Sequence, residues 1–283
     1  MKSKIEIIES LKNNLSTRTT TPKIPTGIYS LDQLTWGVHK KELLVLAARP
    51  SHGKTSLALN MAWGIAKQDI PTIFLSLEMS SEAIYERIMC IEFGLHAWKL
   101  RTGDVIEIKK SYEIMDKFTA RLLTSPLEVF EDKGKTIISV EEVLKEMTPS
   151  VLFIDYAQKI SSKGYGGKYE ALTDYVVRLQ SLAIQYDCAI VLNSQINRGG
   201  SRQENATDFM KGSGEIEEAA DCLLQCEWLY RSDPQRLDTK EFIVKAIKQR
   251  HGPCSYMTLN FDAASFRFLE RETSLPDWQK ESS

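Results

Sequence analysis

Short apolar runs alternate with longer segments of helical periodicity along most of the chain. The runs are short enough to be buried strands, and they fall at residues 43–46, 71–77, 127–130, 151–155 and 188–195. Between them, apolar residues recur every three or four positions, which predicts helices over residues 57–65, 81–91, 97–121 and 171–186, and another that begins at residue 139. Strands that alternate with helices build a mostly parallel α/β sheet flanked by helices.

The last third of the chain has a different pattern. A helix is predicted at 215–222 and a strand at 223–230. Two further runs, at 241–248 and 256–261, surround a Gly-Pro turn, and a last one follows at 266–269. Such closely spaced strands indicate hairpins. We therefore expect a C-terminal antiparallel extension of the parallel sheet.

Local signals predict where some helices begin. Ser80 or Ser81 is expected to cap the helix that follows. Ser139, with Glu142 three residues later, is expected to form a capping box for the helix that begins at residue 139. Residues 97–121 form a helical segment that is interrupted at Thr102-Gly103-Asp104.

The two ends of the chain are polar or amphipathic. Residues 3–14 predict a short amphipathic helix, and a polar tether follows it. Two interpretations of this helix stay open, namely docking on a neighbouring subunit and packing on its own domain. We divide the chain into a linker helix and tether at 1–22, one domain at 23–270 and a polar tail at 271–283.

The first strand leads into a loop that ends in Gly53-Lys54-Thr55, and a helix follows. Strand, loop and helix in this order are the context of a phosphate-binding P-loop, with backbone N–H groups around a phosphate. Lys54 would reach the β- and γ-phosphates of ATP, and Thr55 would ligate Mg²⁺. Ala48 stands where the first glycine of the motif is usual. The expected nucleotide-binding residues are Ala48, Arg49, Pro50, Ser51, His52, Gly53, Lys54, Thr55 and Ser56.

Polar side chains follow three other predicted strands. Asp155 would hold the Mg²⁺ through water, Glu78 could polarise an attacking water, and Gln195 could sense the γ-phosphate. Parallel strands present their carboxyl ends at one edge, so these residues should meet the P-loop there. The simpler alternatives are that Asp155 is a helix-cap or turn aspartate, that Glu78 is merely solvated and that Gln195 is an ordinary loop amide.

Charge, apolar runs and cysteine spacing exclude some classes of protein but do not identify a partner. The 283 residues carry a formal net charge of −2, so a nucleic-acid site would have to be a local basic patch. No apolar run reaches the length of a membrane span, and the N-terminus lacks the apolar core of a signal peptide. The five cysteines and four histidines lack zinc-ligand spacing, which indicates reduced thiols and a cytosolic protein.

Six motifs occur in one order, and together they resemble the motor domain of DnaB-type replicative helicases, within the RecA-like ATPases. They are Ala-Arg-Pro-Ser-x-Gly-Lys-Thr at 48–55, Ser-Leu-Glu-Met at 76–79, Ile-Asp-Tyr at 154–156 with Gln158, Ser-Gln-x-Asn-Arg at 194–198, Gly-Ser-Gly-x-Ile-Glu at 212–217 and Lys-Gln-Arg-x-Gly-Pro at 248–253. The resemblance covers residues 24–270, and Arg101-Thr102-Gly103 also fits it. Ala48 is usual at this place in that family.

The resemblance implies roles that the residues alone do not. Glu78 is similar to the catalytic glutamate that activates water. Arg250 matches an arginine finger and Lys248 its companion, both reaching the γ-phosphate that the adjacent subunit binds. Without the resemblance, Lys248 and Arg250 would be interpreted as a solvated hairpin. Members of the family form hexameric rings around single-stranded DNA, and the helix at 3–14 sits where their linker helix docks on the neighbour.

Two irregular loops are expected to face DNA. They lie at residues 159–168 and 197–214, and a polar loop of that length is usually functional or disordered. Only Tyr165, Tyr169 and Phe209 are aromatic in or next to these loops, which favours phosphate tracking over base stacking. The second loop resembles a backbone-gripping loop of the family, although Gly212 stands where the family commonly has an acid. Solvated surface is the alternative for both loops. The expected DNA-binding residues are Lys163, Lys168, Arg198, Arg202, Lys211, Gly212 and Gly214.

The resemblance predicts a Mg²⁺- and ATP-dependent DNA helicase in the cytoplasm of a bacterial or phage-infected cell. A RecA-type recombinase or a regulatory ATPase without unwinding is the alternative, and a vestigial ATPase is a third. Relatives carry an N-terminal domain that collars the ring and binds primase, whereas here residues 1–22 precede the motor. We expect either a truncated chain or a minimal helicase, with a primase or helicase loader as candidate partners.

Overall fold

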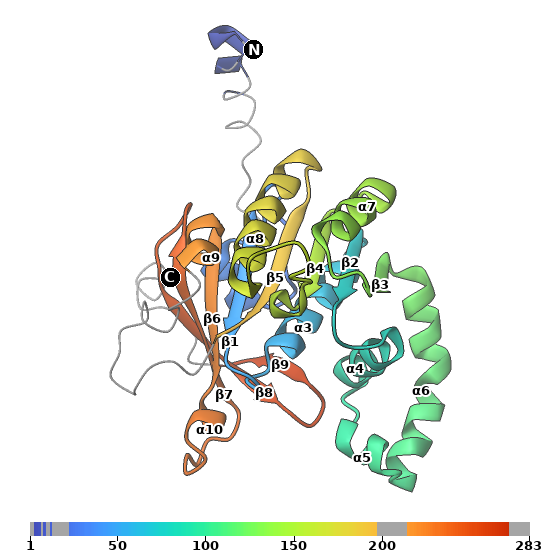
Figure 1. The fold of residues 1–283 in the computed structure, drawn as a ribbon. Helices are drawn as coiled ribbons and strands as arrows, with labels where there is room; N and C mark the ends of the chain where they lie inside the picture. The colour runs from blue at the N-terminus through green and yellow to red at the C-terminus, as the bar shows by residue number, and fades with distance from the viewer. Residues whose placement is uncertain (1–2, 7, 10–11, 13–22, 197–213, 272–283) are drawn as a thin grey trace.

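A single mixed sheet organises the part of the chain that the computed structural model describes, namely residues 3–6, 8–9, 12, 23–196 and 214–271 (Figure 1). Its strand order is β3-β2-β4-β5-β1-β6-β7-β8-β9. The strands are β1 (Leu43–Ala48), β2 (Thr72–Ser76), β3 (Leu127–Glu131), β4 (Val151–Asp155), β5 (Ala189–Gln195), β6 (Cys222–Trp228), β7 (Glu241–Gln249), β8 (Tyr256–Asp262) and β9 (Arg267–Glu270).

The sheet divides into a parallel and an antiparallel part, as the sequence predicts. Strands β3, β2, β4, β5, β1 and β6 pair in parallel, and β6, β7, β8 and β9 pair antiparallel. Because β1 lies between β5 and β6, its carboxyl end is flanked by theirs, with Ala48 opposite Gln195 on one side and Cys226 on the other. The α/β class and the C-terminal antiparallel extension are therefore confirmed.

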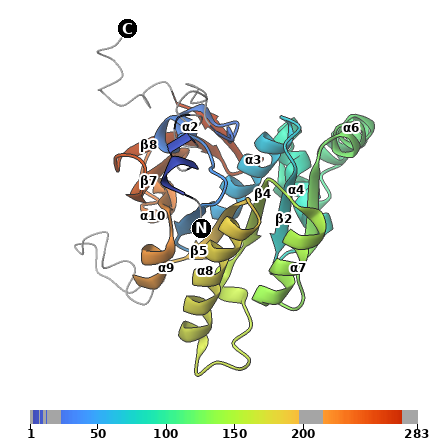
Figure 2. The ribbon, with the colours of Figure 1, turned by 90° about the horizontal axis from the view of Figure 1, so that it is seen from above.

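Helices cover both faces of the sheet (Figure 2). Alternate residues of β1 point to opposite faces: Leu44 and Leu46 join a core with α3 and α4, whereas Leu43 and Val45 join a core with α7 and α8. The helices are α2 (Tyr29–Thr35), α3 (Lys54–Ala66), α4 (Ser81–Phe93), α5 (Ala97–Thr102), α6 (Val105–Thr124), α7 (Ile137–Met147), the 3₁₀ turn η1 (Ala157–Lys159), α8 (Lys168–Gln185), α9 (Gly214–Ala219) and α10 (Leu229–Ser232).

The predicted helix caps are partly right. Ser80 caps α4, because its hydroxyl accepts a hydrogen bond from the backbone N–H of Ala83. The prediction that Ser139 caps α7 is wrong, because the helix begins one turn earlier with Thr136 as its cap. The Ser139 hydroxyl instead accepts from the Thr136 backbone N–H and donates to Asp132, so it completes the capping box from inside the helix.

Two boundaries near β6 also differ from the prediction. The helix predicted at 215–222 ends at Ala219, and the strand begins at Cys222 because β6 pairs with β1 from that residue onward. The strand ends at Trp228, opposite Phe242 of β7, and the following residues form α10. At the N-terminus, residues 4–6, 8–9 and 12 are helical, and the side chains of Ile5 and Ile8 are exposed.

Candidate functional site

The loop after β1 has the backbone of a phosphate cradle. Gly53, the N-cap of α3, has a left-handed φ of 77°, which favours glycine. An added Cβ there would lie 3.2 Å from the ring of Phe261 and 3.3 Å from that of Phe242. Ala48 is the buried last residue of β1 and keeps the negative φ that its methyl group requires. The positive end of α3 therefore opens toward the space above β1.

Lys54, the first residue of α3, lies in a partly buried position next to an aromatic ring. Its ammonium is 4.6 Å from the centroid of the Tyr156 ring, a distance that allows a cation–π contact. Burial lowers the pKa of Lys54 to about 8, and the negative charge of Asp155 opposes this shift. An anion that bound at this loop would restore the ordinary pKa of the lysine.

Thr55 and Asp155 meet at the base of the loop. The Thr55 hydroxyl donates a hydrogen bond of 2.9 Å to Oδ2 of the buried Asp155 carboxylate. The other carboxylate oxygen, Oδ1, accepts a hydrogen bond of 2.8 Å from the side-chain amide of Asn193 on β5. Asn193 therefore fixes the Asp155 carboxylate so that one oxygen faces the P-loop.

This pair of oxygen donors fits Mg²⁺. The ion prefers oxygen ligands and usually keeps water or substrate phosphate in most of its positions, so one hydroxyl and one carboxylate are sufficient protein groups. Among the residues that the structure describes, no group of three or more His, Cys, Asp or Glu side chains could hold a metal by itself. The two donors would therefore suit a Mg²⁺ ion that a bound phosphate also holds.

Glu78 lies just after the carboxyl end of β2, next to the end of β4. Its Oε1 is 3.2 Å from the ammonium of Lys159, and the side chains are 47% and 37% exposed. The adjacent Leu77 backbone N–H donates 2.7 Å to the carbonyl of Asp155. Glu78 therefore faces the same edge as Asp155, but its carboxylate is paired with Lys159.

Gln195 ends β5 beside Ala48, and its backbone is clamped by Gln158. The Gln158 amide donates to the Ser194 hydroxyl at 2.9 Å and to the Gln195 carbonyl at 3.0 Å. Its carbonyl oxygen accepts from the Gln195 backbone N–H at 2.9 Å. Gln158 thus joins η1 to the end of β5 and fixes both at the sheet edge.

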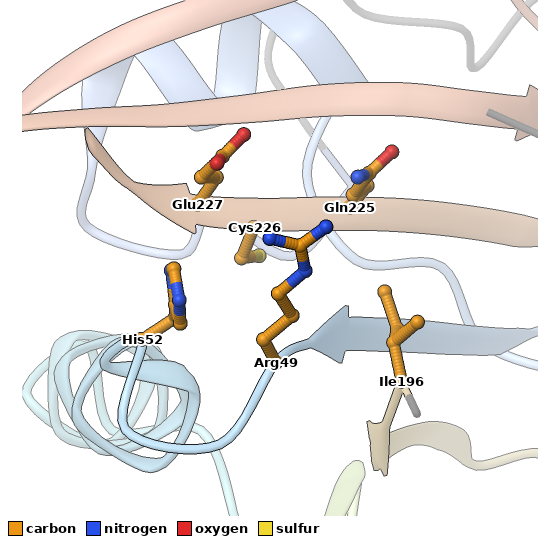
Figure 3. Close-up of a pocket in the computed structure, with 6 residues that line it drawn as sticks. All are labelled: Arg49, His52, Ile196, Gln225, Cys226 and Glu227. Atoms are coloured by element: carbon orange, nitrogen blue, oxygen red, sulfur yellow. The ribbon is translucent and has the colours of Figure 1, made fainter. Parts of the chain in front are cut away.

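The other side of the P-loop borders a small hollow (Figure 3). Arg49 and His52 extend from the loop toward β6, and Gln225 and Glu227 line the hollow from that strand. His52 is buried, and its Nδ1 accepts a hydrogen bond of 3.2 Å from the Trp228 backbone N–H. His52 therefore ties the P-loop to the end of β6. Ile196 and Cys226 also line the hollow.

The hairpin residues Lys248 and Arg250 contact their own subunit. Lys248 donates to the carbonyls of Glu217 and Glu218, at 2.7 and 2.9 Å, near the end of α9. Arg250 pairs with the buried Asp221 at 2.5 Å, and its backbone N–H donates 3.0 Å to the Asp221 carbonyl. Both side chains are therefore bonded to the protein rather than only solvated. None of these contacts joins either residue to the P-loop of its own chain.

The residues expected at DNA lie partly within the described structure. Lys163 is exposed in the loop between η1 and α8, whereas Lys168 and Gly214 begin α8 and α9. Four expected residues lie outside the described residues: Arg198, Arg202, Lys211 and Gly212. Tyr165, in the same loop as Lys163, donates a hydrogen bond of 2.5 Å from its hydroxyl to Asp174 of α8.

Three contacts at the site did not follow from the sequence. Asn193 orients Asp155, Tyr156 lies against Lys54, and Lys159 pairs with Glu78. Each of these residues lies near the carboxyl end of a buried strand, which is the signal that could have placed it at the edge. The pairing itself depends on the strand order β2-β4-β5, which the sequence does not reveal.

Two general observations bear on the class of protein. None of the helices in the described part of the chain has the length and apolarity that a membrane span requires. All five cysteines are free thiols, and burial raises the pKa of Cys90, Cys188, Cys222 and Cys226 to about 12. These buried thiols are therefore structural side chains rather than nucleophiles.

Comparison with known proteins places these features in a family. The chain is 32% identical to the replicative DNA helicase DnaB of Treponema pallidum over 273 residues, which covers 93% of this chain and 60% of the relative. It is 30% identical to the replicative DNA helicase DnaC of Bacillus subtilis, covering 90% of this chain and 58% of that protein. The chain thus spans about 60% of the length of the curated relatives it matches.

Solved structures share the fold. One solved ATPase domain superposes with a TM-score of 0.88 at 21% identity, covering 96% of this chain and all of that domain (100%). A DnaB-like replicative helicase, described with its interactions with primase, gives 0.84 at 20% identity, covering 96% of this chain and 67% of that one. The family model of the DnaB-like helicase C-terminal domain matches residues 23–270. The chain therefore belongs to the family of DnaB-like helicase C-terminal domains.

Proposed function

We propose that this chain is the ATP-hydrolysing motor of a helicase that assembles as a hexameric ring and moves along single-stranded DNA. One observation carries the proposal. The phosphate cradle with Lys54, the Thr55–Asp155 pair and the Glu78 carboxylate all lie at one sheet edge. A phosphate cradle, oxygen donors for Mg²⁺ and a carboxylate base are what ATP hydrolysis needs.

The proposed reaction follows from the placement of these groups. Water attacks the γ-phosphorus, so that its P–O bond forms while the bond from the γ-phosphorus to the bridging oxygen breaks and ADP leaves. Glu78 accepts the water proton, and Lys54 with the loop N–H groups balances the charge on the phosphate oxygens. Bound Mg²⁺, held by Thr55 directly and by Asp155 through water, would neutralise phosphate charge.

The nucleotide-binding residues of the proposal are those of the P-loop, from Ala48 to Ser56. Gln195, at the end of β5 next to Ala48, is proposed to sense the γ-phosphate. His52 supports the loop through its contact with the β6 backbone, and Arg49 borders the adjacent hollow. These placements favour recognition of the phosphates by the loop backbone and by Lys54.

Assembly and DNA binding are further parts of the proposal. Lys248 and Arg250 would reach the nucleotide of the adjacent subunit, which would complete the charge compensation there. The exposed Lys163 loop would contact the DNA backbone, with Lys168, Gly214 and the four residues outside the described structure.

A solved relative is described with its interactions with primase. A primase or a helicase loader is therefore the protein partner proposed for this chain. The five free thiols favour the cytosol as its compartment.

The decisive experiment is strand displacement. The assembled protein, with its ring mass checked by native mass spectrometry, is incubated with ATP, Mg²⁺ and a forked DNA. We expect unwinding by the wild type, and a loss of about 10²-fold or more in hydrolysis for Glu78→Gln with nucleotide binding retained. DNA-stimulated hydrolysis without unwinding by an assembled ring would instead indicate a recombinase or a regulatory ATPase.

A further inference from the structure

Lys159 connects the loop expected to bind DNA with the glutamate proposed to activate water. It is the last residue of η1 and the first residue of the exposed basic loop that precedes α8. Its ammonium lies 3.2 Å from Oε1 of Glu78. One end of the expected DNA loop is thus bonded to the carboxylate proposed to activate water.

The backbone is held on both sides of Lys159. Gln158, the preceding residue, makes three hydrogen bonds to Ser194 and Gln195 at the end of β5. After Lys159, Ile160 is buried and Ser161 donates its backbone N–H to the Lys135 carbonyl at 2.8 Å, whereas residues 162–167 are exposed. A polyanion on the exposed loop would therefore act on the partly exposed side chain of Lys159 while the backbone of η1 stays in place.

The Lys159 side chain also lies near the phosphate cradle. Its ammonium is 5.7 Å from the centroid of the Tyr156 ring, and that of Lys54 is 4.6 Å from the same centroid. The hydrogen bond to Glu78 raises the pKa of Lys159, so the ammonium stays charged at neutral pH. The Glu78 oxygen that lies against this cation is not free to accept a proton from water.

We infer that Lys159 is a positioning residue that restrains Glu78 until DNA binds. In the DNA-free protein, the ion pair holds the Glu78 carboxylate away from the proton of the attacking water. Single-stranded DNA bound by the exposed loop at residues 162–167 draws the Lys159 side chain off Glu78, and the freed carboxylate accepts the proton. Both side chains are partly exposed, so the pair is weak enough for a polyanion to break it. This inference rests on the proposed function.

Substitution of Lys159 tests the inference on the assembled protein. Lys159→Met keeps an unbranched apolar stem and removes the charged ammonium. At saturating ATP, we expect the DNA-free kcat to rise by about tenfold, which is part of the roughly 10²–10⁴-fold contribution of a positioned general base, while KM for ATP stays the same. The ratio of hydrolysis with oligo-dT to hydrolysis without it falls by the same factor. Lys159→Arg, which keeps the pair, leaves the DNA-free rate low.

Lys145→Met is the matched control, since Lys145 is an exposed lysine near the end of α7, outside the loop and the site. It should leave both the DNA-free rate and the stimulation by DNA unchanged. Salt is an independent measurement: added NaCl should raise the DNA-free kcat of the wild type toward that of Lys159→Met, because ions screen an exposed pair.

The outcomes separate the inference from the proposed function. A DNA-free kcat that is unchanged or lower in Lys159→Met overturns the inference, and a fall would make Lys159 a phosphate ligand instead. Should Lys159→Met fail to fold, a wild-type kcat without DNA that does not rise with NaCl overturns it equally. If the wild-type protein is folded and assembled but does not hydrolyse ATP with or without DNA, both the proposed function and the inference are wrong.

Discussion

At the residue scale, Lys54 shows how the site prepares for an anion. The free protein partly buries an ammonium beside Tyr156, and its pKa falls to about 8. The unfolded chain has the ordinary value of 10.5, so it binds more protons than the folded chain between these two pH values. The stability of the nucleotide-free protein should therefore rise with pH through that window. A bound phosphate reverses the effect on Lys54, because it stabilises the charged form.

We predict that nucleotide binding takes up a proton above pH 8. Below the Lys54 pKa of about 8 the free protein already carries the charge, whereas at higher pH the incoming phosphate must restore it. Kd for ADP should therefore rise by up to about tenfold per pH unit above the pKa. Titration calorimetry in two buffers of different ionisation enthalpy measures the uptake. Lys54→Arg, which stays charged, should show none; equal uptake at pH 7 and pH 9 in the wild type would contradict the prediction.

Asn193 is the residue whose role is most specific to the structure. Its amide fixes Oδ1 of Asp155 and leaves Oδ2 toward Thr55. We predict that Asn193→Leu raises the Mg²⁺ concentration needed for half-maximal hydrolysis by about 10- to 100-fold, as for other residues that orient a metal ligand. A Mg²⁺ titration at saturating ATP measures this shift. Ser194→Ala, the neighbouring substitution on β5, should leave the Mg²⁺ requirement unchanged, and equal shifts in both variants would argue against a specific role.

Sequence and structure agree best on residues that act through their own segment. Lys54, Thr55 and Asp155 follow apolar runs directly, and the strand ends place them at one edge. The contacts of Asn193 with Asp155 and of Lys159 with Glu78 join residues 38 and 81 positions apart, which only the strand order brings together. Local pattern therefore predicts which side chains reach the edge, and sheet topology decides which of them meet.

At the element scale, the antiparallel extension supports the P-loop. Phe242 of β7, Phe261 of β8 and Phe268 of β9 pack together, with ring centroids 4.6 to 5.8 Å apart. Gly53 lies directly on Phe242 and Phe261, so these rings form the surface on which the loop turns. The sequence predicts these strands as hairpins, but nothing in their alternation places their aromatic face under the nucleotide site.

We predict that Phe261→Ala loosens the P-loop as well as the core. Phe261 is buried, so its truncation should lower the free energy of unfolding by about 3–5 kcal/mol. The cavity lies under Gly53, so affinity for ADP should fall too. Denaturant unfolding and ADP titration measure the two effects. Phe118→Ala is the matched control, because Phe118 is buried against Phe93 in the α4–α6 region. Its stability loss should be similar, with ADP affinity unchanged.

The start of α7 shows why element boundaries were harder to predict than elements. Ser139 and Glu142 have the spacing of a capping box, yet Thr136 caps the helix and Ser139 serves as its inner partner. The Ser139 hydroxyl also donates to Asp132, whose carboxylate receives the backbone N–H groups of Gly134 and Lys135. The spacing of apolar residues does not reveal this turn, which makes the helix start one turn before the predicted cap at Ser139.

At the scale of the whole molecule, the contacts of Arg250 raise the question of where it acts. In the single subunit it pairs with Asp221, whose other carboxylate oxygen accepts the Leu43 backbone N–H at 2.9 Å. This pair fixes the end of the hairpin at the start of β1, which is the opposite end of that strand from the P-loop. Arg250 therefore cannot serve its own nucleotide without leaving this place, which favours action on a neighbour.

Mixing two inactive variants tests action between subunits. Lys54→Ala removes the cradle lysine and Arg250→Ala the finger, and each homogeneous ring should lose about 10³-fold in hydrolysis. In a ring built by head-to-tail contacts, random 1:1 mixing leaves about one interface in four with an intact Lys54 facing an intact Arg250. Mixed rings should therefore hydrolyse ATP well above either parent. The matched control mixes Arg250→Ala with the double variant, where no interface is complete; activity no higher than in that control would place Arg250 at its own nucleotide.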